Sequence, residues 1–180
     1  MTGRAFALVG PSGAGKDTLL AAAAARRPRL HVVRRVVTRP EAAGGEDFEG
    51  VSAETFAARR AAGAFALVWE AHGLCYALPE SARRVQAEGD DVIFNGSRAM
   101  LSAAAAVFPR LRVLLVTAPR DVLAARLAER GREDAAEIAA RVARVPPPLP
   151  AALPVTEIDN SGALETALAQ LLDALQPDRA

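Results

Sequence analysis

Short, unbroken apolar runs recur along the chain, and stretches rich in helix-forming residues separate them. Five of the runs are typical of buried strands, at positions 5–9, 29–33, 91–95, 112–117 and 154–159. Runs of this length without regular polar alternation indicate parallel strands that are buried on both faces. The pattern therefore predicts an α/β fold, with a five-stranded parallel sheet covered by helices on both faces.

Helical stretches follow most of these strands. We expect helices at 19–25, 53–62, 80–88, 98–107, 119–129, 133–145 and 163–175. The segment 34–80 interrupts the alternation, because it combines basic residues, a polar loop, a helix that begins after Ser52 and a further strand at 65–69. We expect this segment to form a small inserted subdomain within a single domain that spans 1–180.

Composition limits the classes of partner. The chain has 180 residues, of which 51% are apolar and 24% charged, and its net charge is +1. This balance argues for a globular domain without bulk binding of nucleic acid or of a membrane. The single cysteine, Cys75, excludes an intrachain disulfide, and no apolar run approaches the ~20 residues of a membrane span. We expect a cytoplasmic protein, with monomer and homodimer both left open.

The first strand leads directly into a glycine-rich stretch and then into the first helix. The stretch, here called the P-loop, reads Gly10, Pro11, Ser12, Gly13, Ala14, Gly15, Lys16, Asp17, Thr18. Strand, glycine-rich loop and helix in this order indicate a phosphate-binding site made of backbone amides, a helix N-terminus and a lysine ammonium. Lys16 is also the only lysine of the chain. The alternative is a flexible turn with a surface lysine.

The P-loop departs from the usual pattern at the residue after the lysine, where serine or threonine is expected. Asp17 occupies that position, and the hydroxyl comes one residue later at Thr18. We expect both residues near a Mg²⁺ ion, with Asp17 acting through a water molecule.

Two groups of arginines are candidates for the other parts of a kinase site. A kinase for a small phosphorylated acceptor needs an anion site for the acceptor and cations over the transferred phosphoryl group. We assign the first role to Arg34, Arg35 and Arg39. We assign the second to a lid region at 126–145 that carries Arg126, Arg130, Arg132 and Arg141. An ordinary charged surface is the alternative for either group alone.

Several polar residues are weaker candidates for contacts with substrate. Glu46 and Asp47 lie in an acidic loop, and we expect Glu70 and His72, near Trp69, to line the acceptor pocket. We expect these side chains near sugar hydroxyls. Because ligands of parallel α/β sheets bind at the carboxyl ends of the strands, residues after the last strand also face the site. Asn160 is there, and we expect it to contact the adenine of ATP.

These motifs together resemble the guanylate kinase family. The match runs in order through the P-loop, Thr38-Arg39-Pro40, Phe65, Gly73, Tyr76, Arg126-Leu127-x-x-Arg130-Gly131 and Ile138-x-x-Arg141. The resemblance implies the P-loop nucleoside-monophosphate kinase fold, with Arg39 and Tyr76 on the acceptor's phosphate. It also implies that Arg126, Arg130 and Arg141 close over ATP and the moving phosphoryl group.

The chain departs from that family where guanine is read. The family's guanine-binding glutamate falls at Leu67 and the accompanying serine or threonine at Leu78, while a phosphate-binding tyrosine falls at Phe48. The Asp-x-Asp of the third core strand reads Asn95-Gly96-Ser97. A site that selects a base by hydrogen bonds does not exchange those polar groups for leucine, so a guanine acceptor is disfavoured.

A narrower resemblance fits these departures. The segments 15–18, 44–48, 69–76 and 95–98 are similar to the ribose 1,5-bisphosphate phosphokinases of phosphonate degradation. This resemblance implies that ATP, with Mg²⁺, phosphorylates the 1-phosphate of ribose 1,5-bisphosphate to give 5-phospho-α-D-ribose 1-diphosphate (PRPP) and ADP. Two alternatives stay open: a guanylate or other nucleoside-monophosphate kinase, and a non-catalytic guanylate-kinase-like binding module.

Overall fold

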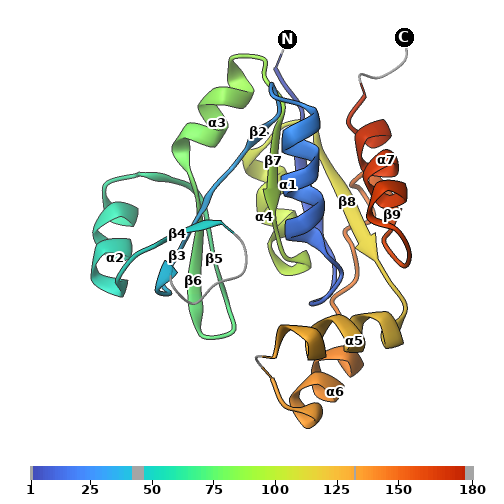
Figure 1. The fold of residues 1–180 in the computed structure, drawn as a ribbon. Helices are drawn as coiled ribbons and strands as arrows, with labels where there is room; N and C mark the ends of the chain where they lie inside the picture. The colour runs from blue at the N-terminus through green and yellow to red at the C-terminus, as the bar shows by residue number, and fades with distance from the viewer. Residues whose placement is uncertain (1, 42–46, 132, 177–180) are drawn as a thin grey trace.

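The computed structural model of the protein describes residues 2–41, 47–131 and 133–176. Its main sheet has five parallel strands in the order β2-β7-β1-β8-β9 (Figure 1). The strands are β1 (Ala5–Val9), β2 (His31–Val32), β7 (Val92–Asn95), β8 (Leu111–Thr117) and β9 (Val155–Asp159). The five-stranded parallel sheet predicted from the apolar runs is therefore confirmed.

Alternate residues of β1 build two different cores. Phe6 and Leu8 pack with α1 (Lys16–Arg26) and α7 (Leu164–Ala174) on one face of the sheet. Ala5, Ala7 and Val9 pack on the other face, with α3 (Glu80–Ala87) and α4 (Leu101–Val107), which follows a 3-10 turn at Arg98–Met100. Every residue of β1 is fully buried, which explains its unbroken apolar pattern.

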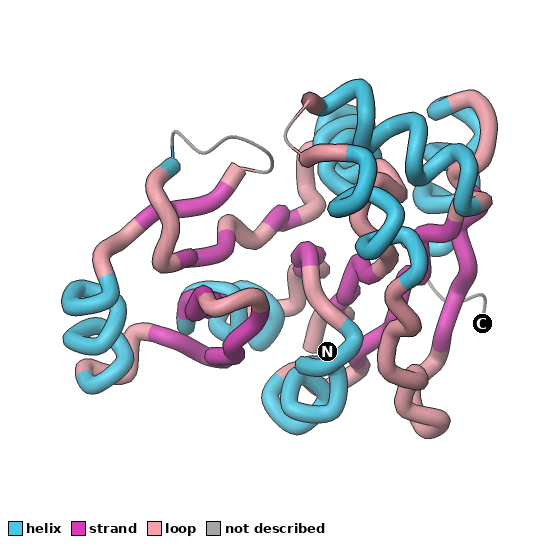
Figure 2. Tube along the Cα trace, turned by 90° about the horizontal axis from the view of Figure 1, so that it is seen from below, coloured by secondary structure: helices cyan, strands magenta, loops and turns pink. Residues whose placement is uncertain are grey.

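A second sheet lies beside the main one and comes entirely from residues 35–79. Its order is β4-β3-β6-β5, with β3 (Arg35–Val37), β4 (Phe48–Gly50), β5 (Phe65–Ala71) and β6 (Leu74–Pro79). Helix α2 (Ala53–Ala61) belongs to the same region, and the Ser52 hydroxyl accepts a hydrogen bond from the amide of Thr55 at its start. In Figures 1 and 2 this sheet and α2 lie on the side of the molecule away from α7.

Three strands of the second sheet, β3, β4 and β6, were not predicted from the sequence. β3 lies within the basic stretch that contains Arg34, Arg35 and Arg39. β4 closes a stretch that looks like a polar loop, and β6 lies directly before α3, so its apolar residues looked like a lead-in to that helix. β5 and β6 form a tight hairpin, whose two turn residues, His72 and Gly73, have φ of 53° and 72°. Positive φ at both positions matches the two-residue turns that suit a right-handed strand twist.

Helices α5 (Arg120–Arg130) and α6 (Ala135–Ala143) pack against each other beyond the carboxyl end of β8 (Figure 1). Gly131 ends α5 with φ of 62°, and Asp134 begins α6 in a reciprocal capping box with Glu137. Both helices were predicted. Within the described ranges, none of the helices has the length and apolar character needed to cross a membrane.

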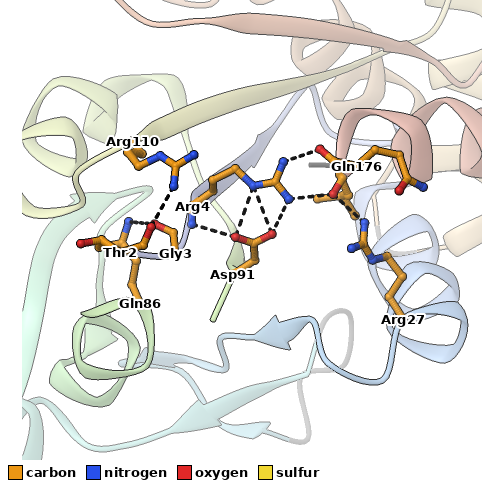
Figure 3. A network of polar contacts seen from close by, with 9 residues as sticks. Thr2, Gly3, Arg4, Arg27, Gln86, Asp91, Arg110 and Gln176 are labelled. Carbon is orange, nitrogen blue, oxygen red and sulfur yellow. Dashed lines mark hydrogen bonds and ion pairs between the residues drawn. The ribbon is translucent and has the colours of Figure 1, made fainter. Parts of the chain in front are cut away.

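A buried arginine, Arg4, connects the start of β1 to the residues that follow α7 (Figure 3). The Arg4 side chain is 6% exposed; it forms an ion pair with Asp91 and donates to the carbonyls of Leu175 and Gln176. Arg27 donates to the same Leu175 carbonyl at 2.6 Å. This network joins β1, the start of β7 and the end of α7 at the edge of the sheet opposite the P-loop.

Candidate active site

A cleft of about 670 Å³ opens at the carboxyl ends of β1 and β7. Four parts of the chain line it: the P-loop, one face of the second sheet, residues 95–99 at the end of β7, and the α5–α6 region with the prolines that follow. A pocket of about 360 Å³ lies on the other side of Gly13 and Gly15 and is lined by Thr18, Arg126 and Asn160 among others. We call these the main cleft and the side pocket.

The glycines of the P-loop are required by close packing and by their backbone angles. A Cβ on Gly15 would lie 2.5 Å from Asn160 Nδ2, and one on Gly10 would lie 2.3 Å from the carbonyl oxygen of Val116. Gly13 and Gly15 have φ of 84° and 85°, a region that side chains disfavour. In the described chain no side chain caps the first turn of α1, so its amides face the loop.

Two side chains hold the P-loop in shape. Lys16 Nζ donates to the carbonyl oxygens of Gly10 and Pro11, at 2.9 and 3.1 Å, so the ammonium lies folded over the loop. Asn160 Nδ2 donates to the carbonyl oxygen of Ala14 at 2.7 Å and anchors the loop to the end of β9. The result is a preformed anion site with a positive charge next to the amides.

Asp17 is held by a neighbour from the next strand. Its Oδ1 accepts a hydrogen bond from Asn95 Nδ2 at 2.8 Å, and Asn95 is 6% exposed at the carboxyl end of β7. Asp17 lines the main cleft, whereas Thr18 lines the side pocket. Of the two residues predicted near Mg²⁺, only Asp17 therefore faces the main cleft.

The second sheet contributes a basic and aromatic wall, here defined as Arg35, Arg39, Phe48, Trp69 and Tyr76. Trp69 and Tyr76 face each other across the β5–β6 hairpin and stack, with ring centroids 5.4 Å apart and 13° between planes. The Arg35 guanidinium lies 5.2 Å from the Tyr76 centroid and 5.8 Å from that of Trp69. Arg39 lies 4.5 Å from the Phe48 centroid.

The α5–α6 region brings further arginines to the main cleft, namely Arg130, Arg141 and Arg144. Arg141 forms an ion pair with Glu133 and donates from Nη2 to Ser12 Oγ at 3.1 Å, which links α6 to the P-loop. Burial lowers the pKa of Arg141, and the charges of Arg144 and Arg130 lower it further. Positive charge is thus concentrated opposite the P-loop, as a polyphosphate site requires.

Arg126 lies beside the P-loop on the side-pocket face. Its Nη1 lies 4.0 Å from the position that a Cβ on Gly15 would occupy, which is an ordinary van der Waals distance. That nitrogen is buried and has no hydrogen-bond partner among the described residues. A buried guanidinium nitrogen without an acceptor beside a phosphate-type loop fits an anionic ligand.

No model of a known protein family matches the chain. Curated relatives match it over nearly its full length. It is 49% identical to "Ribose 1,5-bisphosphate phosphokinase PhnN" of Ruegeria sp. (strain TM1040), over 99% of this chain and 94% of that protein. It is 48% identical to the protein of the same name from Rhizobium etli (strain CIAT 652), over 93% of this chain and 87% of that protein. The chain belongs to the ribose 1,5-bisphosphate phosphokinase family.

The fold agrees with this membership. The structure of guanylate kinase from Anaplasma phagocytophilum aligns with a TM-score of 0.68 at 17% identity, over 97% of this chain and 85% of that one. The P-loop kinase fold implied by the resemblance is therefore confirmed, and ribose 1,5-bisphosphate phosphokinases share it with guanylate kinases at low sequence identity.

Most residues predicted from sequence for this phosphokinase meet in the two pockets. The P-loop residues other than Ala14 and Thr18 line the main cleft, together with Arg35, Arg39, His72, Tyr76, Arg130 and Arg141. Thr18, Arg126 and Asn160 line the side pocket, and Arg130 reaches both. Ala14 is fully buried and contributes its backbone alone. Arg132 and Glu46 lie outside the described residues.

Three of the predicted side chains, those of Arg34, Asp47 and Glu70, line neither pocket. Arg34 points to solvent, where it binds Asp47 at 2.8 Å and Glu41 at 3.2 Å. The hydrogen bond that Arg34 donates to Asp47 raises the pKa of Arg34. Glu70 is exposed and is paired with Cys75. Because side chains alternate along a strand, Glu70 lies on the face of the hairpin opposite Trp69.

Residues to which the sequence assigned no role also line the cleft. Ser97, Arg98 and Arg144 all do so, and the Ser97 hydroxyl is buried without a hydrogen-bond partner in the described chain. Ser97 and Arg98 follow β7 directly, at the strand edge where ligands were expected. Their position after the clear apolar run of β7 was the feature of the sequence that could have identified them as site residues.

Proposed function

We propose that this protein transfers the γ-phosphoryl group of ATP to the 1-phosphate of ribose 1,5-bisphosphate, giving PRPP and ADP. Membership of the phosphokinase family supports this substrate. The structural observation that supports this substrate is the composition of the acceptor side of the cleft. It offers guanidinium groups and aromatic rings, while Leu67 and Leu78, at the base-reading positions, are 7% and 0% exposed.

The donor is expected at the P-loop. The loop amides and Lys16 bind the β- and γ-phosphates, and the side pocket holds the nucleoside next to Asn160 and Thr18. The buried Nη1 of Arg126 provides a donor for a phosphate oxygen on that side. The glycine packing described above keeps this cradle rigid, so little reorganisation is needed when phosphates bind.

The acceptor's 1-phosphate is expected at Arg39 and Tyr76. One of its oxygens attacks the γ-phosphorus, the bond between that phosphorus and the β–γ bridging oxygen breaks, and ADP leaves. A phosphate oxygen is already ionised at neutral pH, so the step needs no general base. Arg130 and Arg141 lie opposite the P-loop and balance the charge of the transferred group.

The residues of the main cleft also fit Mg²⁺. This ion keeps several waters and takes one or two carboxylates together with substrate phosphates. Asp17 supplies one carboxylate next to the P-loop, and Asn95 fixes the orientation of that carboxylate. Asp17 would hold the ion through water. When bound, Mg²⁺ neutralises charge on the phosphates.

Product analysis after incubation with ATP, Mg²⁺ and ribose 1,5-bisphosphate tests the proposal. We expect ³¹P NMR to show a new diphosphate at C1 with an unchanged 5-phosphate. Lys16→Ala should reduce turnover by roughly 10²-fold or more, because it removes the charge over the reacting phosphates. Arg120→Gln, an exposed change at the start of α5, is the matched control and should leave turnover unchanged. Near-normal activity of Lys16→Ala with an intact fold would reject the assignment.

A further inference from the structure

The wall of the main cleft carries two arginines on one strand and its continuation. Arg35 lies in β3, and Arg39 follows it after a bend. Both line the cleft together with Val37, whereas Val36 is buried against α2 on the other face. Four residue steps separate the two arginines, which places their Cα atoms at most roughly 13 Å apart along extended chain. The Arg35 guanidinium lies over Tyr76 and Trp69 and the Arg39 guanidinium over Phe48, so the wall offers two separate anion contacts.

The strand order of the sheet places the two guanidinium groups on opposite sides of β3. Val36 is paired with Ala77 and Val37 with Tyr76, and the amide of Thr38 donates to the Cys75 carbonyl oxygen at 3.0 Å. Continuing this antiparallel register puts Arg35 level with Leu78. Arg39 is level with the residues next to the hairpin turn. Phe48, the ring under Arg39, belongs to β4 on one side of β3, whereas Tyr76 and Trp69, the rings beside Arg35, belong to β6 and β5 on the other side.

The surroundings at the level of Arg35 are apolar apart from the guanidinium. Leu67 is paired with Leu78 there, and both are buried in the same cluster against which Trp69 packs. Neither leucine offers a hydrogen bond to a nucleobase. The planar guanidinium beside two stacked rings is held by cation–π attraction and keeps its N–H donors in its own plane. Such a group is suited to a phosphate.

We propose that Arg35, positioned by Trp69 and Tyr76, binds the 5-phosphate of the acceptor, the phosphate that does not react. Arg39 then serves the reacting 1-phosphate. This inference rests on the proposed function and names how the site selects a sugar bisphosphate. A furanose ring separates the two phosphates of this acceptor, and two guanidinium groups on opposite sides of β3 match that arrangement. Trp69 is on this account a specificity-determining residue, because it fills the cleft beside Arg35.

Steady-state kinetics with ribose 1,5-bisphosphate separates the two roles. A contact with the non-reacting phosphate is equally present in ground and transition states, so Arg35→Gln should raise KM and spare kcat. We expect KM to rise roughly 10- to 100-fold, with kcat within about threefold of the original protein. Arg39→Gln should lower kcat, because it changes the position of the attacking oxygen. Arg34→Gln is the matched control: the same substitution, one residue away, outside the cleft.

Direct binding of ribose 5-phosphate, followed by NMR titration, provides a readout that needs no activity. Arg35→Gln should weaken this binding by roughly 10-fold or more, Arg35→Lys by less, and Arg34→Gln not at all. Trp69→Ala keeps the charge but removes the stacking platform, and should weaken binding in the same direction.

Two results would overturn the inference: a loss of kcat in Arg35→Gln as large as that in Arg39→Gln, or unchanged binding of ribose 5-phosphate. Failure of the proposed function looks different. The original protein would then not turn over ribose 1,5-bisphosphate, while the titration would still report whether Arg35 holds the 5-phosphate.

Discussion

Asp17 occupies the P-loop position at which a serine or threonine is usual, and the structure supplies its partner. Asn95 comes from a strand 78 residues further along the chain and donates to Oδ1 of this carboxylate. The sequence predicted Asp17 from the spacing after Lys16. It could not predict the hydrogen bond, because that contact depends on β7 being the sheet neighbour of β1.

Asn95→Ala tests whether this hydrogen bond positions Asp17 for a metal ion. Loss of a residue that orients a ligand typically weakens metal binding 10- to 100-fold, so we expect the Mg²⁺ concentration for half-maximal activity to rise about 10-fold. At saturating Mg²⁺, kcat should recover most of its original value. A purely structural role would instead lower the melting temperature and leave the Mg²⁺ requirement unchanged.

Ser97 supports a second prediction at the residue scale. Its hydroxyl is buried, lines the main cleft and has no hydrogen-bond partner in the described chain. A ligand hydroxyl or phosphate oxygen would satisfy it. Ser97→Ala should raise the KM for the acceptor about 5-fold, the value of one hydrogen bond, with the melting temperature unchanged or higher. An unchanged KM would show that substrate does not reach this hydroxyl.

The elements that the sequence predicted best are the strands that are buried on both faces, because this burial requires an apolar residue at nearly every position. β1, β7 and β8 are continuous apolar runs because helices cover both sides of the main sheet. β4 and β6 have no such signal. β4 has only three residues, and both strands belong to a sheet with one face on the cleft. Residues such as Tyr76 and Phe48 therefore occupy their positions because of tertiary contacts that the local pattern does not show. The acceptor wall was therefore predicted less well than the P-loop.

The α5–α6 pair carries a prediction at the element scale. Arg141 connects α6 to the P-loop through Ser12 and forms an ion pair with Glu133. Arg141→Gln should lower kcat roughly 10²-fold, since removal of one charge-stabilising donor commonly has that effect. The KM for the acceptor should change much less. Arg120→Gln on α5 is again the control. Equal losses of kcat in both variants would mean that the effect comes from the overall positive charge and not from the position of Arg141.

The Arg4 network acts on the whole molecule, because it joins the first strand to the last helix far from the cleft (Figure 3). Burial alone would raise the pKa of Asp91, but the hydrogen bonds and charge of Arg4, with a contribution from Arg27, outweigh it and hold that pKa below its ordinary value. A lowered pKa in the folded state stabilises the protein above the ordinary aspartate pKa of about 3.9. This contribution is lost as pH falls through the folded pKa.

Asp91→Asn should therefore destabilise the protein at neutral pH and reduce the steepness of its acid unfolding. Leaving the buried Arg4 without its partner costs about 3 kcal/mol, the lower end of values for broken buried pairs, because Asp91 is partly exposed. Denaturant unfolding at pH 7 and at several pH values below about 4 measures both effects. Asp90→Asn, beside an exposed Arg29 at 3.8 Å, is the control and should change little. Activity should be unaffected in both, and a selective loss of kcat in Asp91→Asn would contradict this separation.

The central claim is that the cleft selects a sugar bisphosphate in place of a nucleotide. It is tested most directly by ADP release with ATP and Mg²⁺, comparing ribose 1,5-bisphosphate with GMP as acceptors. We predict turnover with the sugar bisphosphate and none above background with GMP, because buried leucines stand where a base would be read. Efficient phosphorylation of GMP would contradict the account and return the protein to the nucleotide kinases whose fold it shares.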